Sequence, residues 1–104
     1  MRTAQAQKWT AGEIVETLGQ HRGELAEFGV RRIGLFGSYV RDEATPESDM
    51  DILVEMDAPT FRSYTRLWSF LESSFGCEID LVLSDTLKLR VRPHVLGEVR
   101  FAMR

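Results

Sequence analysis

Residues 30–56, VRRIGLFGSYVRDEATPESDMDILVEM, decide the fold of this chain. The strand-like pattern of Val30–Phe36 predicts a β-strand that ends at Gly37-Ser38, and Met50–Met56 predicts a second strand. Between the two strands, the sequence favours a short helical turn over Ser38–Asp42 and then a polar loop. Successive side chains of a strand point to opposite faces, so residues two positions apart share one face of the sheet.

A helix is predicted before the first strand. Thr10 and Glu13 form the pattern of a helix-capping box, and apolar residues then recur at helical spacing up to Gly29. Two internal glycines, Gly19 and Gly23, weaken the prediction of one unbroken helix, because glycine is a poor helix former.

A second helix and a third strand are predicted after the second strand. The helix covers about Phe61–Phe75 and ends at Gly76, and the strand covers Glu78–Leu83. One side of this helix is expected to lie in the core and carries Phe61, Tyr64, Leu67, Trp68 and Leu71. The remainder, 85–104, predicts a final helix or an irregular tail that Pro93 interrupts.

Strands separated by helices predict an α/β (α+β) fold, with a small mixed sheet and helices packed on one face. The 104 residues contain no internal repeat and no long linker, so we expect a single domain over 1–104. No apolar run is long enough to span a bilayer, and no secretory signal is visible, so the chain is expected to be cytoplasmic and without a membrane partner. The single cysteine, Cys77, excludes a disulfide framework and a cysteine-based zinc site. The net charge of −3 argues against a general nucleic-acid binder.

Three aspartates are predicted to meet on one face of the sheet. Asp49 and Asp51 lie opposite the apolar face of the second strand, and Asp80 lies opposite the apolar face of the third. If these strands are neighbours, the carboxylates converge, and crowded carboxylates repel one another unless a cation neutralises them. Oxygen ligands of this kind suit Mg²⁺, which binds one or two carboxylates together with substrate phosphates. For Asp49 and Asp51 alone, the other interpretation is a solvated turn.

The Gly37-Ser38 turn supplies groups that can bind phosphate. A strand that runs into glycine and then serine presents backbone N–H groups and a hydroxyl at the positive end of a helical turn. Gly37 permits a close approach to a triphosphate, Ser38 can hydrogen-bond its outer phosphate, and Arg41 on the same side of the turn adds a cation. A Gly-Ser pair alone is too common to be informative.

The segment Gly37–Glu55 closely resembles the signature of the minimal nucleotidyltransferases, members of the DNA polymerase β-like superfamily. Its Gly-Ser pair is followed by ten residues and then by Asp-x-Asp, and Glu78–Val82 looks like the third element, an aspartate on a later strand. The resemblance covers about 30–83 and implies a nucleotidyltransferase core similar to the polymerase β palm.

The resemblance also implies a role for each acid. Asp49 and Asp51 match the two acids that bind both metal ions, and Asp80 matches the acid on the catalytic metal. The implied chemistry is nucleotidyl transfer with two Mg²⁺ ions, in which these three residues are the catalytic and metal-binding residues and ATP is the substrate.

Nucleotide binding and a protein partner are implied in the same way. Gly37 and Ser38 match the phosphate-binding turn, and Arg41 matches a recurrent arginine of the antitoxin subgroup. Many of these proteins are antitoxins encoded with a HEPN-domain toxin, an RNase, and transfer AMP from ATP to a tyrosine of that toxin. The resemblance therefore implies a protein adenylyltransferase that assembles with a cognate HEPN toxin and does not bind nucleic acid directly.

Two other functions stay open. The chain could be a non-catalytic antitoxin that binds the toxin while its nucleotide site is vestigial. It could also transfer a nucleotide to RNA or to a small molecule. The acidic net charge disfavours RNA, whereas the five bases against one acid over 88–104 favour it.

Overall fold

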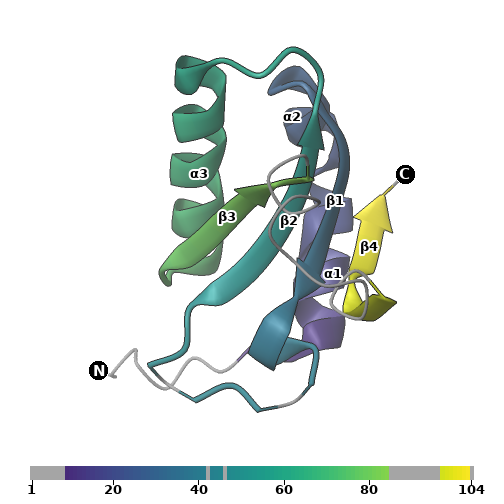
Figure 1. The fold of residues 1–104 in the computed structure, drawn as a ribbon, viewed down its shortest axis with the longest axis vertical. Helices are drawn as coiled ribbons and strands as arrows, with labels where there is room; N and C mark the ends of the chain where they lie inside the picture. The colour runs from purple at the N-terminus through teal and green to yellow at the C-terminus, as the bar shows by residue number, and fades with distance from the viewer. Residues whose placement is uncertain (1–8, 42, 46, 85–96, 104) are drawn as a thin grey trace.

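A four-stranded sheet with helices on one face forms the framework of the protein (Figure 1). The computed structural model describes residues 9–41, 43–45, 47–84 and 97–103. The elements are α1 (Ala11–Gln20), α2 (Arg22–Glu27), β1 (Val30–Phe36), the 3-10 helix η2 (Gly37–Tyr39), β2 (Met50–Met56), α3 (Phe61–Phe75), β3 (Ile79–Leu83) and β4 (Arg100–Met103). The strand order is β3-β2-β1-β4, with β2 and β3 parallel and the other two pairs antiparallel. The predicted mixed sheet is confirmed.

Helix α3 connects β2 to β3, and this crossover is what a parallel pair of strands requires. The helix begins at Thr60, whose hydroxyl accepts a hydrogen bond from the Ser63 N–H at 3.0 Å. It ends at Gly76, which adopts the left-handed conformation with φ 69°. In Figure 1, α3 stands beside β3.

The hydrophobic core lies between the helices and one face of the sheet. Side chains from all three helices and from the strands form one buried cluster that includes Ile14, Leu18, Leu25, Ile33, Leu35, Met50, Ile52, Val54, Leu67, Leu71, Phe75, Ile79 and Leu81. The even-numbered side chains of β2 therefore face the core, as the alternation of its sequence predicts. The opposite face of β2 carries Asp51, Leu53 and Glu55.

The N-terminal helical segment is divided into α1 and α2, in the region where Gly19 and Gly23 weakened the prediction of one unbroken helix. His21 ends α1 and precedes α2, and its N–H donates to the Leu18 carbonyl at 3.1 Å, as in a 3-10 turn. Gly19 and Gly23 stand on either side of this break, where the low helix propensity of glycine makes the interruption less costly.

Strand β4 was not predicted from the sequence. The sequence predicts a helix or an irregular tail over 85–104, but residues 85–96 and most of the bases of this segment lie outside the described residues. Asp42, the last residue of the predicted helical turn, also lies outside them. Residues 100–103 form a strand that pairs with β1. Gly34 makes this close approach possible, because a Cβ there would lie 2.7 Å from Cγ1 of Val99.

The prediction for the core side of α3 was only partly right. Leu67 and Leu71 are buried, but Phe61 is 85% exposed and Trp68 is 39% exposed. The stripe that faces the core runs from Leu67 through Leu71 to Phe75, and Phe61 and Trp68 lie outside it. Within the described parts of the chain, no helix is long and apolar enough to cross a membrane.

Candidate functional site

The end of β1 and the beginnings of β2 and β3 bring three predicted site residues together. Phe36, the last residue of β1, pairs with Asp51, and Asp51 pairs with Asp80. Gly37 follows Phe36 directly, so Gly37, Asp51 and Asp80 lie side by side across three adjacent strands. The convergence of the acids was predicted only if their two strands are neighbours, and β2 and β3 do pair directly.

Gly37 is in direct contact with the carboxylate of Asp51. Its φ of 82° is in the left-handed region, and a Cβ built on it would lie only 2.1 Å from Oδ2 of Asp51. The carboxylate thus occupies the space that any larger residue would need. The turn after β1 and the first acid of β2 therefore form one packed unit.

The helical turn after β1 is the 3-10 helix η2. The Gly37 carbonyl accepts hydrogen bonds from the N–H groups of Val40 at 3.0 Å and Arg41 at 3.3 Å. The Ser38 carbonyl accepts one from the Glu43 N–H at 2.9 Å, so local bonds determine the path of the turn. The sequence predicts that the turn starts at Ser38, whereas η2 starts one residue earlier at Gly37, and Ser38 is half-buried within it.

Asp49 lies directly before β2 and follows a loop whose residues Thr45 and Ser48 are hydrogen-bonded to each other. The Thr45 N–H donates to Oγ of Ser48 at 2.9 Å, and the Ser48 N–H donates to the Thr45 carbonyl at 2.9 Å. Asp49 follows this turn with an exposed side chain, and the charge of Asp49 helps to raise the pKa of Asp51. The charge of Asp49, at the end of the loop, therefore adds to the negative charge around Asp51 and Asp80.

Asp51 is the most perturbed acid of this group. Its carboxyl is half-buried, and burial raises its pKa from 3.8 to about 6. The negative charges of Asp80 and Asp49 and a hydrogen bond with the Asp80 carboxyl act in the same direction, while the charge of Arg41 opposes them. A carboxyl that is costly to ionise in a cluster of like charges is typical of a functional site that binds a cation.

The donor set fits a divalent cation that also binds a substrate. No group of three His, Cys, Asp or Glu side chains within the described ranges is arranged to hold a metal ion by itself. Mg²⁺ needs only one or two carboxylates when substrate phosphates supply the other ligands. The neighbouring carboxylates of Asp51 and Asp80 match that requirement, and a cation there would offset the charge repulsion at Asp51.

Arg41 is exposed and is held by two carboxylates. Its Nε donates to Oε1 of Glu43 at 2.9 Å, and its Nη1 donates to the carboxylate of Glu98 at 3.1 and 3.3 Å. Its charge lowers the pKa of Asp51, so the guanidinium lies within electrostatic range of the acids. Sequence reasoning missed Glu98, because it is 57 positions from Arg41 and no spacing rule connects them.

Tyr39 and Cys77 are two further neighbours of Asp49 that sequence reasoning did not assign to the site. Burial raises the pKa of both side chains, and the charge of Asp49 contributes to each shift. Both groups are therefore neutral near pH 7. The sequence did contain a signal for both residues: Tyr39 directly follows Gly37-Ser38, and Cys77 lies just before β3.

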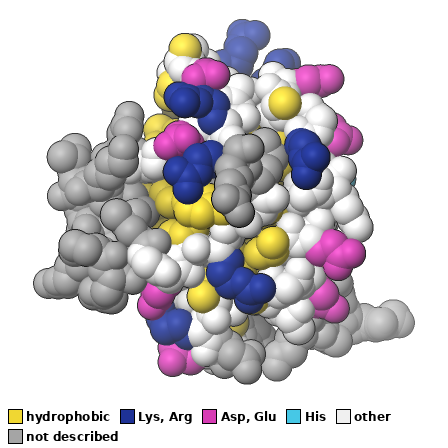
Figure 2. Space-filling view, turned by 90° about the vertical axis from the view of Figure 1, so that its right-hand side faces the viewer, with side chains coloured by type: hydrophobic (Ala, Val, Ile, Leu, Met, Phe, Trp, Pro, Cys, Tyr) yellow, Lys and Arg dark blue, Asp and Glu magenta, His cyan; other side chains and the backbone are white. Residues whose placement is uncertain are grey.

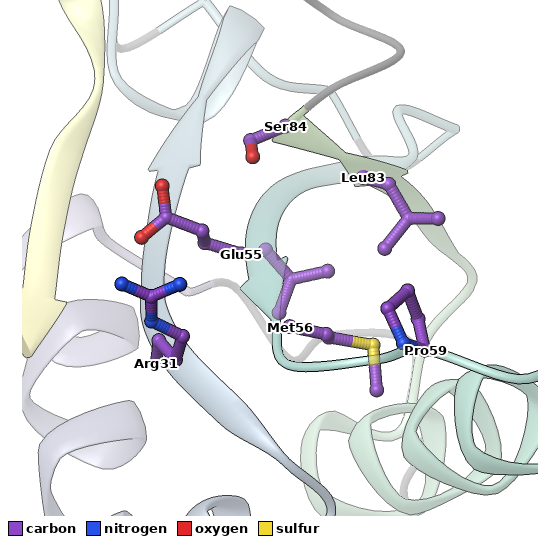
Figure 3. A pocket seen from close by; sticks show the side chains of 7 residues that line it. Arg31, Glu55, Met56, Pro59, Leu83 and Ser84 are labelled. Atoms are coloured by element: carbon purple, nitrogen blue, oxygen red, sulfur yellow. The ribbon is translucent and has the colours of Figure 1, made fainter.

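A pocket of about 250 Å³ lies at the opposite end of the strands (Figure 3). It is lined by Arg31, Val54, Glu55, Met56, Pro59, Leu83 and Ser84. Glu55 is the one acid in this lining, so the pocket has no carboxylate cluster comparable with that of Asp51 and Asp80. The end of the sheet that carries Asp51 and Asp80 and this pocket are thus different places.

Charged side chains of both signs are interspersed on the face nearest β4, around apolar patches (Figure 2). Among the described residues in this view, the basic side chains do not gather into one continuous positive patch of the kind that is typical of nucleic-acid binding.

The chain is similar to known nucleotidyltransferases. Residues 18–102 match the nucleotidyltransferase domain family. Protein adenylyltransferase MntA of Thermococcus cleftensis is 46% identical over 92 residues, which cover 86% of this chain and 93% of that protein. A Methanocaldococcus jannaschii protein named as a candidate protein adenylyltransferase is 42% identical over 82 residues, covering 75% of this chain and 82% of that protein. A solved structure described as a candidate minimal nucleotidyltransferase superimposes with a TM-score of 0.68 at 35% identity, covering 83% of this chain and 93% of that one.

Proposed function

Because the chain belongs to the nucleotidyltransferase domain family, we propose that it transfers AMP from ATP to a hydroxyl of a partner protein. The observation that carries this proposal is the register of the three strands, which sets the Gly37 turn against Asp51 and Asp51 against Asp80. Phosphate-binding backbone and paired acids are the two parts that such a reaction needs.

The nucleotide is bound by Gly37, Ser38 and Arg41. The turn at Gly37-Ser38 offers backbone N–H groups and a hydroxyl to the triphosphate. The guanidinium of Arg41 lies within electrostatic range of the acids and presents a cation to the same phosphates. Glu43 and Glu98 hold this guanidinium by three hydrogen-bond contacts, so its position does not depend on the nucleotide.

Asp49, Asp51 and Asp80 hold the divalent cations, which we propose are two Mg²⁺ ions. The family uses a nucleotide substrate and a divalent metal. When bound, the cations lower the pKa of the acceptor hydroxyl and neutralise charge on the departing pyrophosphate. The like charges around Asp51 support this assignment, because their repulsion is relieved by a cation.

At the α-phosphorus of ATP, the transfer forms one bond to oxygen and breaks another. The acceptor oxygen attacks the α-phosphorus of ATP, and the bond from that phosphorus to the pyrophosphate oxygen breaks. The hydroxyl proton passes to the exposed carboxylate of Asp80 or to water. Orientation of the two reactants and electrostatic stabilisation supply most of the rate.

We propose that the acceptor is a tyrosine of a cognate HEPN-domain toxin and that the chain acts as its antitoxin in a hetero-oligomer. The resemblance of Gly37–Glu55 to the antitoxin subgroup supports the toxin, and the name of the Thermococcus cleftensis relative supports a protein acceptor. A cytoplasmic location is proposed with it, because ATP is the substrate.

The test is a labelling reaction with Mg²⁺, ATP labelled at the α-phosphate, and a lysate of the source cells. The variant Asp49→Asn/Asp51→Asn removes two charges from the site. The matched control Glu55→Gln/Asp57→Asn removes two charges from the other end of the same strand. We expect a labelled protein band with wild type and control and none with the site variant, and mass spectrometry of the band to find AMP on tyrosine.

Each other outcome contradicts part of the proposal. Label in RNA or in a small molecule would move the acceptor to those classes. Capture of a specific toxin without any label, unaffected by the site variant, would make the chain a non-catalytic antitoxin.

A further inference from the structure

Strand β3 is at one edge of the sheet, and α3 covers its outer side. The strand order gives β3 one strand neighbour, β2, among the described elements. The Glu78 carbonyl accepts a hydrogen bond from the Met50 N–H at 3.1 Å, so the backbone of the even-numbered residues points to β2. By alternation, the backbone groups of Ile79 and Leu81 point outward, where an edge strand leaves them unpaired.

Three side chains of α3 bind these outward groups. The Tyr64 hydroxyl donates to the Leu81 carbonyl, and Nε1 of Trp68 donates to the Ile79 carbonyl at 2.8 Å. Oε2 of Glu72 accepts from the Ile79 N–H at 3.1 Å. Helix side chains thus take the place of a neighbouring strand on both sides of Asp80.

The spacing of these side chains makes this possible. Tyr64, Trp68 and Glu72 follow one another at intervals of four, which places them on one face of the helix. The core stripe of α3 has the same interval and lies next to it. The helix therefore packs on the core with one stripe and binds the strand edge with the other, which explains why Trp68 is part-exposed and still fixed.

We propose that Tyr64, Trp68 and Glu72 are positioning residues for Asp80, holding the β3 backbone so that the Asp80 carboxylate stays beside Asp51. The inference rests on the proposed role of Asp80 in binding the divalent cation. Asp51 and Asp80 repel each other when ionised, and a strand held from one side can yield to that repulsion. Catalytic groups need to be fixed to within about 0.5 Å, and bonds on both sides of Asp80 meet that need.

Tyr64 is suited to this role at neutral pH. Burial raises the pKa of its phenol, and the charge of Asp80 raises it further. The hydroxyl therefore keeps its proton and continues to donate to Leu81.

The experiment compares Tyr64→Phe and Trp68→Phe with Trp9→Phe. The control also loses an indole donor to a backbone carbonyl, because Nε1 of Trp9 donates to the carbonyl of Phe75 at 3.0 Å, and Phe75 belongs to α3 and not to β3. Two quantities are measured: hydrogen exchange of the β3 amides, and the affinity for Mn²⁺ by electron paramagnetic resonance with a non-hydrolysable ATP analogue. We expect both test variants to exchange these amides faster and to bind Mn²⁺ about tenfold more weakly, as for one lost hydrogen bond. The control changes neither quantity.

The pair Glu72→Leu and Glu72→Gln repeats the test without altering an aromatic residue. Leucine removes the acceptor for the Ile79 N–H, whereas glutamine keeps an oxygen there, so we expect glutamine to restore Mn²⁺ affinity. Normal Mn²⁺ affinity in Tyr64→Phe and Glu72→Leu would overturn the positioning role alone. Failure of the wild type to bind Mn²⁺ would overturn the role of Asp80 and with it the proposed metal chemistry.

Discussion

The two ends of β2 carry carboxylates in opposite situations. Asp51 at the first end is half-buried, and the charges of two other acids, Asp80 and Asp49, help to raise its pKa. Asp57, just past the other end, has 69% of its side chain exposed and forms an ion pair with Arg31 at 3.4 Å. Asp51 therefore lies among other negative charges, whereas Asp57 is solvated and paired with a positive charge.

The two ends of β2 therefore differ in what their carboxylates contribute to the stability of the fold. A solvated ion pair such as that of Asp57 is ordinary surface structure and contributes little to stability. A half-buried carboxyl among like charges opposes folding, so it persists where it has another use. The contrast supports the proposed site at the first end of β2, although the pocket of Figure 3 opens at the other end.

The largest expected difference between the two ends is in catalysis. Asp51→Asn should lower the initial rate of AMP transfer by at least about a hundredfold, because it removes one of the charged ligands that we propose for the cations. Asp57→Asn should leave the rate unchanged. The rate is measured as label transferred from ATP to the acceptor band. Equal losses in both variants would mean that net charge, rather than the site, controls the reaction.

Next in size is the effect of a methyl group at the turn. Gly37→Ala should lower the free energy of unfolding by about 3 kcal/mol, from left-handed backbone strain of about 1–2 kcal/mol together with overpacking against Asp51. Gly76→Ala has similar strain, at φ 69°, but open space around the added carbon, so about 1 kcal/mol is expected. Urea unfolding distinguishes them, and similar losses at both positions would show that Asp51 yields without cost.

The smallest effect has the opposite sign. In EDTA at pH 7.5, Asp51→Asn should raise the free energy of unfolding by about 1 kcal/mol, a value reduced for the partial exposure of the carboxyl. The folded protein holds this proton with a pKa of about 6 against 3.8, so ionisation destabilises the fold as pH rises through 6. The gain should therefore vanish near pH 4.

The control for this measurement is Asp57→Asn, which removes an exposed ion pair and should change the stability by no more than about 0.5 kcal/mol. A destabilised Asp51→Asn variant would mean that the carboxylate contributes more through packing against Gly37 than it costs through repulsion. Urea titrations at the two pH values decide between these results.

Much of this arrangement was predictable from local patterns. The period of two in β2 and β3 separated Asp51 and Asp80 from the core, and the Gly37-Ser38 pair marked the turn that faces them. Strand β4 was missed because its four residues are too short for a periodic signal and its pairing depends on the packing of Gly34. Trp68 was misassigned because helical spacing does not distinguish a side chain that faces the core from one that faces a strand edge.

The parallel pairing of β2 with β3 has a consequence for the order of folding. A short connection over 37–49 joins β1 to β2, so this hairpin can form early and bring Gly37 against Asp51. Strand β3 adds its acid only after α3 has crossed over, which closes a longer loop. The turn can therefore form before the acid pair, and Asp51 and Asp80 come together only when the crossover is complete.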